Sequence, residues 1–391
     1  MSFTLIGRES LLETDLQKIF GGAGCAGVRH VDLGDTQAAP EGCDAGMIVL
    51  WRGGQPVGHF LRGSDGRCHI SAVAAAQDSR PAPPPASLPS ASVVICTRDR
   101  PNELRRCLSS LPEQSFPPAE VIVVDNASSG SETREVALAA GAIYVREDRP
   151  GLDIARNRGA KRASSEIVAY TDDDVLLHPN WLEQLIAAFD GPSVGAVTGL
   201  VLPAEIATEA QRHFETCWSF GQGYTSQIFR AADFAARKHE VFPAWKVGAG
   251  ASMAFRREVF DRAGLFDERL DVGQAGCSGD SEYWYRLLAN GYDCRYQPSS
   301  VAFHFHRRTV EGLAQQIYSY MRGHSAALLV QYERTGVKAN LKQVFKWMPL
   351  WYLGRIRRKL LGRGAAEDRF LWREVAGYVS GILFYLRRRG G

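Results

Sequence analysis

The chain has 391 residues, 45% hydrophobic and 23% charged, which is typical of a soluble globular protein and excludes disorder over its whole length. Its eight cysteines show no Cys-x-x-Cys pair and no zinc-ligand spacing, so they predict no zinc site. The net charge of +3 is unevenly spread. Residues 345–391 carry eleven Lys or Arg and three Asp or Glu, so a basic C-terminal end follows a mildly acidic body.

No apolar stretch approaches the ~18 residues that a membrane-spanning helix needs. The first residues also lack the basic and then long apolar pattern of a signal peptide. We therefore expect a cytoplasmic protein in a reducing compartment.

Residues 1–75 predict a small β-rich module of their own. Within it, the apolar runs 47–52 and 55–61 are separated by two glycines, which is the pattern of a β-hairpin. Residues 76–90 are rich in Ala, Pro and Ser, so we expect an extended linker that packs no core.

From residue 91 onward, short apolar runs alternate with helical patterns. The expected strands are 93–96, 121–124, 143–145 and 167–170, and the expected helices between them begin near residues 101, 132 and 151. Alternation at this spacing predicts an α/β fold with a mostly parallel, Rossmann-like sheet. Ligands of such sheets bind beyond the carboxyl ends of the strands.

Three adjacent carboxylates, Asp172, Asp173 and Asp174, close the last of these strands. Such charges repel one another and are costly to bury unless a cation or hydrogen-bond donors neutralise them. Carboxylates together with substrate phosphates are the ligands that Mg²⁺ or Mn²⁺ prefers. The alternative is a solvated acidic turn before a helix that begins near Pro179 and Asn180.

Polar residues also follow the first two strands. Thr97 and Arg98 come after the first, and Asp125 comes after the second. A carboxylate at this place can accept a hydrogen bond from the N3–H of uracil or thymine. Alternatively, Asp125 and Asn126 form an ordinary Asx turn.

Three further segments carry chemistry. Residues 151–162 are basic and helical, as a phosphate-facing helix or a solvated basic face would be. Asp280 follows the glycine-rich stretch 273–279 and opens an aromatic helix, so it is either an N-cap or a general base. His304 and His306 stand in an apolar run, where a histidine is usually structural but could complete a metal site.

Six motifs of the chain resemble those of the family 2 glycosyltransferases in order and spacing. They are Ser92–Arg98, Val123–Ser128, Ala155–Gly159, Thr171–Asp174, Gly279–Glu282 and His304–Arg307. The resemblance covers about residues 91–310 and is specific as a set, although each motif alone is weak. It implies an inverting enzyme with the A-type glycosyltransferase fold and a nucleotide-sugar donor.

The resemblance also implies roles for individual residues. Thr97, Arg98 and Asp125 would hold the nucleobase and ribose, and Asp153, Arg156 and Asn157 would line the nucleotide pocket. Asp172 and Asp174 would bind a divalent metal, Mn²⁺ or Mg²⁺, and the diphosphate, while Asp173 would contact the ribose or the sugar. His304 would be the third metal-site residue, with His306 as the fallback.

Asp280 resembles the aspartate of a Glu-Asp pair that deprotonates the acceptor hydroxyl. The Glu position is Gly279 here, and Glu282 offers the nearby acid instead. Residues 248–257 resemble the family's acceptor-side strand, and Trp245 is expected with Lys246 in the acceptor pocket.

Residues 311–391 predict a basic, amphipathic helical region. Its aromatic residues and arginines favour binding to an anionic membrane surface, and the alternative is a helical lid on the catalytic domain. We expect no nucleic-acid partner, because no nucleic-acid-binding fold is recognisable.

The sequence thus predicts a cytoplasmic, peripherally membrane-associated glycosyltransferase, catalytic over residues 91–310. Its partners would be a UDP- or dTDP-sugar, with a GDP-sugar also open, and a glycan or lipid-linked acceptor. Because no channel-forming span is found in the sequence, we do not expect a processive synthase that exports its product. Surface polysaccharide synthesis is the expected context. Two alternatives remain: a catalytically silent nucleotide-sugar-binding scaffold subunit, and a nucleotidyltransferase, whose glycine-rich phosphate loop after the first strand is not seen at residues 97–101.

Overall fold

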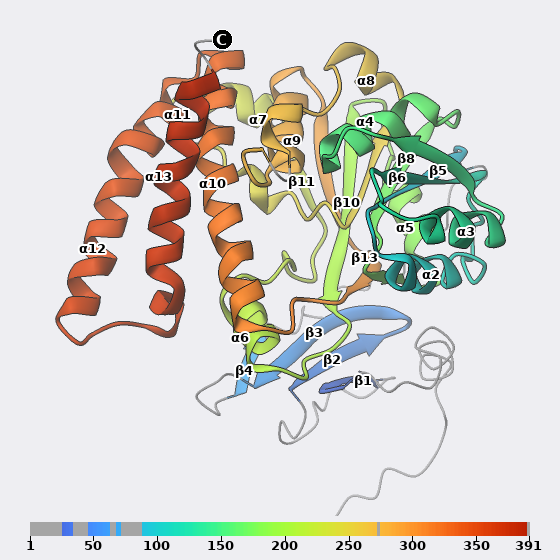
Figure 1. Ribbon diagram of the computed structural model, residues 1–391, viewed down its shortest axis with the longest axis horizontal. Helices are drawn as coiled ribbons and strands as arrows, with labels where there is room; N and C mark the ends of the chain where they lie inside the picture. Colours follow the sequence, from blue (N-terminus) through green and yellow to red (C-terminus); the bar gives the residue numbers. More distant parts are fainter. Residues whose placement is uncertain (1–25, 34–45, 63–67, 72–87, 272–273, 389–391) are drawn as a thin grey trace, which may run out of the picture.

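The computed structural model describes residues 26–33, 46–62, 68–71, 88–271 and 274–388. Most of the predicted linker, residues 76–87, lies outside this part of the chain, as does Gly273 of the glycine-rich stretch. Figure 1 shows three parts: a central sheet with helices on both faces, a smaller N-terminal sheet below it, and C-terminal helices beside it.

Four parallel strands form one half of the central sheet, as predicted. In spatial order they are β8 (Ile167–Asp172), β5 (Ala91–Thr97), β6 (Glu120–Asn126) and β7 (Ile143–Glu147). The connecting helices are α2 (Pro101–Ser109), α3 (Glu132–Ala139) and α4 (Leu152–Arg162). Successive side chains of β5 enter different cores: Val93 packs with α2 and α3, whereas Val94 packs with α4.

The other half of the sheet is mixed. Its strands are β9 (Val175–Leu177), β10 (Val194–Pro203), β11 (Gln227–Phe229), β12 (Ser252–Arg256) and β13 (Asp293–His304). β12 runs antiparallel between β8 and β10, and β10 pairs in parallel with β13. The helices of this half are α5 (Trp181–Ala187), α6 (Glu209–Cys217), α7 (Ala231–Ala236), α8 (Glu258–Arg262) and α9 (Gly279–Ala289).

Strand register brings the polar residues to one edge of the sheet. Thr97 pairs with Asp125 across β5 and β6, and Cys96 pairs with Asp172 across β5 and β8. His304, the last residue of β13, pairs with Val175, which directly follows the acidic triplet. The register therefore places the triplet and His304 side by side.

The predicted hairpin is confirmed within a four-stranded sheet of β1 (Val28–Asp32), β2 (Met47–Arg52), β3 (Gln55–Arg62) and β4 (Cys68–Ser71). This sheet shares a hydrophobic core with the central sheet, in which Trp51 of β2 packs with Leu200 and Phe303. The Trp51 ring also stacks on His178 at 5.3 Å between centroids.

The C-terminal region is helical, with α10 (Val310–Thr335), α11 (Lys338–Lys342), a π-helical turn (Gln343–Trp347), α12 (Met348–Leu360) and α13 (Leu371–Arg388). Figure 1 shows α10 and α13 lying side by side. Gly377 and Gly381 make this approach close, because a Cβ at either would meet the α10 backbone. Among the described residues, no helix is long and apolar enough to span a membrane.

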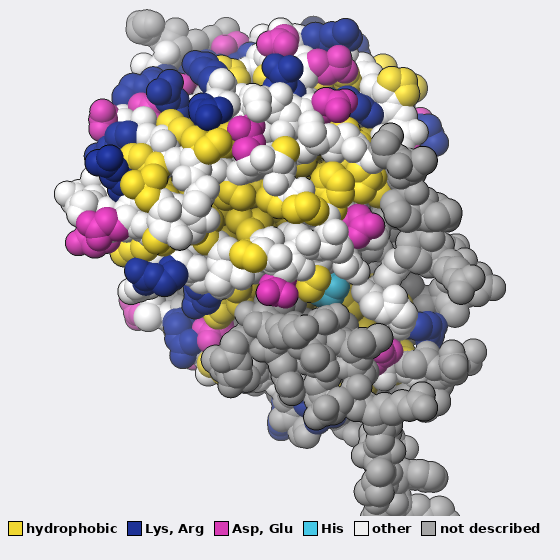
Figure 2. Space-filling view, turned by 90° about the vertical axis from the view of Figure 1, so that its right-hand side faces the viewer, with side chains coloured by type: hydrophobic (Ala, Val, Ile, Leu, Met, Phe, Trp, Pro, Cys, Tyr) yellow, Lys and Arg dark blue, Asp and Glu magenta, His cyan; other side chains and the backbone are white. Residues whose placement is uncertain are grey.

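The basic end of the chain is not entirely a surface feature. Arg355 of α12 is buried and forms ion pairs with Asp368 at 2.7 Å and Glu374 at 2.6 Å. Figure 2 shows the other side of the molecule, away from the C-terminal helices, where hydrophobic side chains gather across the middle and charged ones of both signs lie mainly around them.

We predict that Trp51→Ala lowers the free energy of unfolding by about 3–5 kcal/mol, because it removes a fully buried aromatic ring shared by the two sheets. Urea denaturation measures this change. The exposed Leu138→Ala is the matched control and should stay within about 0.5 kcal/mol of the parent. A Trp51→Ala variant as stable as that control would show that the N-terminal sheet is not part of the fold's core.

Candidate active site

The acidic triplet is held in place by the last residue of β5 and by an arginine of the loop that follows this strand. Thr97 donates a hydrogen bond from its hydroxyl to Asp173 Oδ2 at 2.7 Å. Arg100 contacts Asp173 Oδ1 at 2.6 Å and Asp174 Oδ2 at 2.9 Å. The sequence analysis did not identify Arg100, since no pattern distinguishes it from other loop arginines. Its guanidinium supplies positive charge directly to the triplet.

Asp172, Asp174 and His304 form a group suited to a divalent cation. One ligand atom from each lies within 4.8 Å of the others, and His304 Nε2 is 3.1 Å from Asp174 Oδ1. Burial raises the pKa of Asp172, and the Asp174 charge adds to this rise. For His304, burial lowers the pKa, but the Asp174 carboxylate outweighs it and raises the pKa overall. The oxygen and imidazole donors fit Mn²⁺ or Mg²⁺.

His306, the fallback ligand, faces away from this group. Its Nε2 lies 2.6 Å from Glu215 Oε1 on α6, and its Nδ1 lies 2.9 Å from His304 Nδ1. Burial lowers the pKa of His306 below its ordinary value, against the opposing effect of Glu215. Of the two histidines, His304 is therefore the one placed to hold a metal.

Helix α4 presents one arginine to the site. Arg156 is buried, 3.1 Å from Asp153 Oδ1 and 3.9 Å from Asp172 Oδ1. The N-terminus of this helix is not free for phosphate, because the backbone N–H of Ile154 donates to the Asp271 carboxylate at 3.1 Å. The predicted phosphate-facing helix thus offers a guanidinium rather than its terminal N–H groups.

Asp153 fills the space beside Gly279. A Cβ at Gly279 would collide with the Asp153 carboxylate, so a larger residue there would have to displace that side chain. Burial raises the pKa of Asp153 to about 7, against the lowering effect of Arg156. The carboxylates of Asp271 and Asp280 contribute to this rise.

Asp280 lies at the start of α9, partly exposed and within the cavity wall. Its Oδ1 accepts a hydrogen bond from the backbone N–H of Ser281 at 2.7 Å. Its Oδ2 lies against Gly250, where Arg156 also approaches, so a side chain at Gly250 would displace both. Glycine at position 250 therefore leaves room for the side chains of both Asp280 and Arg156 beside the same stretch of backbone.

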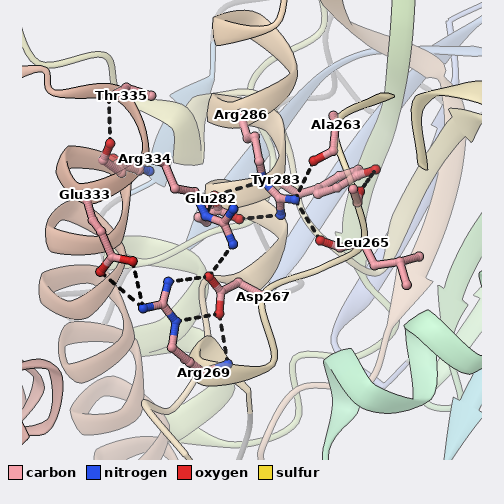
Figure 3. Close-up of polar contacts among 12 residues, drawn as sticks. Ala263, Leu265, Asp267, Arg269, Glu282, Tyr283, Arg286, Glu333, Arg334 and Thr335 are labelled. Carbon is pink, nitrogen blue, oxygen red and sulfur yellow. Dashed lines mark hydrogen bonds and ion pairs between the residues drawn. The ribbon is translucent and has the colours of Figure 1, made fainter. Parts of the chain in front are cut away.

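The expectation that Glu282 supplies an acidic partner to Asp280 is wrong. Figure 3 shows Glu282 directed toward Arg286 and Arg334, with contacts of 2.7 Å and 3.4 Å. Two positions along a helix place a side chain on a different face, so Glu282 points into the protein and Asp280 into the cavity. The i, i+4 spacing of Glu282 and Arg286 is the sequence signal for this ion pair.

Two predicted nucleotide-binding residues, Asp125 and Asn157, form hydrogen bonds with other parts of the protein. Asp125 accepts hydrogen bonds from the backbone N–H of Ser128, from Tyr144 at 2.7 Å and from Arg146 at 3.0 Å. Burial raises the pKa of Asp125, but these donors outweigh it and lower the pKa overall. Asn157 bonds the backbone of Phe266 through both ends of its amide. In the part of the chain that the structure describes, neither residue lines the cavity.

A cavity of about 1010 Å³ joins the remaining candidates. Those in its wall are Thr97, Arg98, Asp153, Arg156, Asp172, Asp173, Asp174, Asp280 and His304. Trp245 also lines it, whereas Lys246 is not among the described residues that do. Two further parts of the wall were not predicted from the sequence: the loop at Trp218–Gln222, and the C-terminal aromatic residues Trp347 and Trp351.

We predict that Glu282→Gln lowers the free energy of unfolding by about 3 kcal/mol, because it leaves the buried Arg286 guanidinium without its counter-charge, whereas Arg334 keeps its contact with Asp267. Thermal and urea denaturation measure this effect. Asp280→Asn likewise replaces a carboxylate by its amide, two residues earlier and at a partly exposed position. It should leave the free energy of unfolding within about 0.5 kcal/mol of the parent. Equal effects of the two substitutions would contradict the assignment of Glu282 to the fold and Asp280 to the cavity.

The sequence profile of "Glycosyl transferase family 2" matches residues 92–264. The O-antigen biosynthesis protein RfbC of Myxococcus xanthus is 30% identical over 219 residues, which are 52% of this chain and 16% of that protein. Glycosyltransferase AglE of Haloferax volcanii is 32% identical over 240 residues, 59% of this chain and 71% of that protein. The chain thus spans a small part of the first relative and most of the second.

The mannosyltransferase PcManGT from Pyrobaculum calidifontis, solved in complex with GDP-Man and Mn²⁺, is similar in structure. The TM-score is 0.53 at 20% identity, covering 77% of this chain and 89% of that one. This likeness confirms the A-type glycosyltransferase fold. Together with the profile match and the similarity to AglE, it shows that the chain belongs to glycosyltransferase family 2.

Proposed function

We propose that this protein is an inverting, metal-dependent glycosyltransferase that moves a sugar from a nucleotide-sugar to a hydroxyl of a glycan or lipid-linked acceptor. One observation carries the proposal: a single cavity contains both the Asp172, Asp174 and His304 group and the Asp280 carboxylate. A cation site for a diphosphate and a base for an acceptor are the two parts that a single displacement needs.

The charged residues of the cavity would take different parts in this reaction. Asp172, Asp174 and His304 would hold the divalent cation, which supplies positive charge to the departing diphosphate. Arg100 and Thr97 keep the triplet oriented, and Arg156 adds a fixed positive charge at the same wall. Asp280 takes the proton of the acceptor hydroxyl as that oxygen attacks the anomeric carbon. One displacement inverts the anomeric configuration and requires no carboxylate nucleophile.

The donor nucleotide is proposed to be a uracil or thymine diphosphate. Asp125 stands at the sheet edge beside Thr97, and its carboxylate is held there by Ser128, Tyr144 and Arg146. Thr97 lies on β5, between the strand of this aspartate and the strand that ends in the triplet, and both Thr97 and the following Arg98 line the cavity. Guanine is the competing base, and direct titration distinguishes the two.

The acceptor is proposed to occupy the part of the cavity that the C-terminal region lines. Trp347 and Trp351 form the wall of this part and are also about half exposed at the surface. The neighbouring Phe345, Leu350 and Leu353 are exposed as well. An apolar ridge that continues into the cavity suits an acceptor carried by a lipid at an anionic membrane surface.

The setting is proposed to be surface polysaccharide or glycoconjugate synthesis. The name of the Myxococcus xanthus relative, an O-antigen biosynthesis protein, supports this context. The protein would then act at the inner face of the cell membrane, with no nucleic-acid partner.

Asp280→Asn should abolish sugar transfer, with a loss of about 10²–10⁴-fold in kcat, because it removes the base and leaves the donor wall intact. Donor affinity, measured by calorimetry with Mn²⁺ present, should stay unchanged. Transfer is measured by release of the nucleoside diphosphate in the presence of acceptor. Near-parental turnover by this variant would refute the role of Asp280.

The triple variant Phe345→Ser, Leu350→Ser and Leu353→Ser should lose binding to vesicles that contain phosphatidylglycerol, because it removes the exposed apolar ridge. Co-flotation measures the bound fraction, with phosphatidylcholine vesicles as the uncharged comparison. Point substitutions are preferable to deleting residues 345–391, since α13 packs on α10. Leu138→Ser on the distant α3 is the control, and equal binding by parent and triple variant would exclude the ridge as a membrane surface.

A further inference from the structure

A chain of buried hydrogen bonds runs from the acidic triplet to helix α6. His304 Nε2 lies 3.1 Å from Asp174 Oδ1, and His304 Nδ1 lies 2.9 Å from His306 Nδ1. His306 Nε2 in turn lies 2.6 Å from Glu215 Oε1. All four side chains are less than a tenth exposed, so water does not replace these contacts.

The Glu215 carboxylate, at the end of this series of hydrogen bonds, determines which atom donates in each of them. An ionised carboxylate only accepts hydrogen bonds, so the hydrogen between Glu215 and His306 belongs to His306 Nε2. Neutral His306 then has its lone pair on Nδ1, and the facing Nδ1 of His304 must be the donor. This leaves Nε2, the atom of His304 nearest Asp174, as the nitrogen available to a cation.

Glu215 is itself fixed by its surroundings. It lies on α6, whose N-terminus is closed by a capping box between Thr208 and Gln211. The second oxygen of Glu215 accepts a hydrogen bond from the Ser219 hydroxyl at 3.0 Å. Ser219 belongs to the cavity wall, as does the next residue, Phe220, whose ring meets His304 edge-on at 5.4 Å.

We infer that Glu215 and His306 are positioning residues that select the metal-binding tautomer of His304 and connect it to the Ser219–Phe220 wall of the cavity. The inference rests on the metal site of the proposed function, and it adds two residues outside that site. Neither Glu215 nor His306 touches the donor or the cation in this scheme; both act through His304.

Removing such a partner typically lowers metal affinity by about 10–100-fold, because the ligand loses its fixed orientation and tautomer. Glu215→Ala should show a loss of this size. Glu215→Gln should show a smaller loss, because its amide oxygen can still accept from His306 Nε2. The order parent, Gln, Ala in Mn²⁺ affinity is therefore the expected result.

The experiment titrates the full-length protein with Mn²⁺ alone and follows free ion by electron paramagnetic resonance. Pulsed measurements on the bound ion add a direct test, since an imidazole nitrogen on Mn²⁺ produces a ¹⁴N modulation. Parent protein should show this modulation, and Glu215→Ala should weaken it. Glu209→Gln, an exposed change on the same helix, is the matched control and should alter neither readout.

Two outcomes separate this inference from the proposed function. Parent protein that binds no Mn²⁺ would overturn the metal site and the inference together. Parental Mn²⁺ affinity and ¹⁴N modulation in folded Glu215→Gln and Glu215→Ala, with both lost in His304→Ala, would overturn the inference alone. Circular dichroism establishes that each variant is folded, and Glu215→Gln keeps the test decisive if Glu215→Ala does not fold.

Discussion

Asp172, Asp173 and Asp174 lie side by side at the end of β8, the first partly exposed and the other two buried, where ionised carboxylates repel one another. Their neighbours are arranged around this charge. Arg100 pairs with two of them, Arg156 approaches the third, and His304 closes the group from β13. Burial still raises the pKa of Asp173 to about 7, so the protein's own cations compensate the charge only in part. A bound divalent ion would complete the compensation.

The rest of the fold brings a second carboxylate to this site and closes the space between them. Helix α9 carries Asp280 on its cavity side, while Glu282 on its inner side ties it to α10 through Arg334. The same α10 packs on α13 and on the π-helical turn before α12, and this turn and α12 line the cavity with Trp347 and Trp351. The C-terminal region thus forms part of the wall of the cavity, as expected of a helical lid. The membrane surface that we propose for it would be formed by the exposed Phe345, Leu350 and Leu353.

The parallel half of the sheet could be predicted because its strands and helices have clear apolar periods. The triplet, Asp280 and His304 could be predicted because each follows or opens such an element. The directions of the side chains were harder to predict from the sequence. Glu282 and Asp280 are two residues apart, and the packing of α10 on α9 turns Glu282 toward Arg334 while Asp280 faces the cavity. Arg355 similarly counts as a surface cation until Asp368 and Glu374, on later segments, enclose it.

The central claim is that a donor nucleotide binds at the triplet through a divalent ion. Calorimetric titration of UDP, dTDP and GDP, each with Mn²⁺ and with EDTA, tests it most directly. We expect one nucleotide, UDP or dTDP, to bind with Mn²⁺ and to lose that binding in EDTA and in Asp174→Ala. Equal binding with Mn²⁺ and EDTA, or no binding of any nucleotide, would contradict the account.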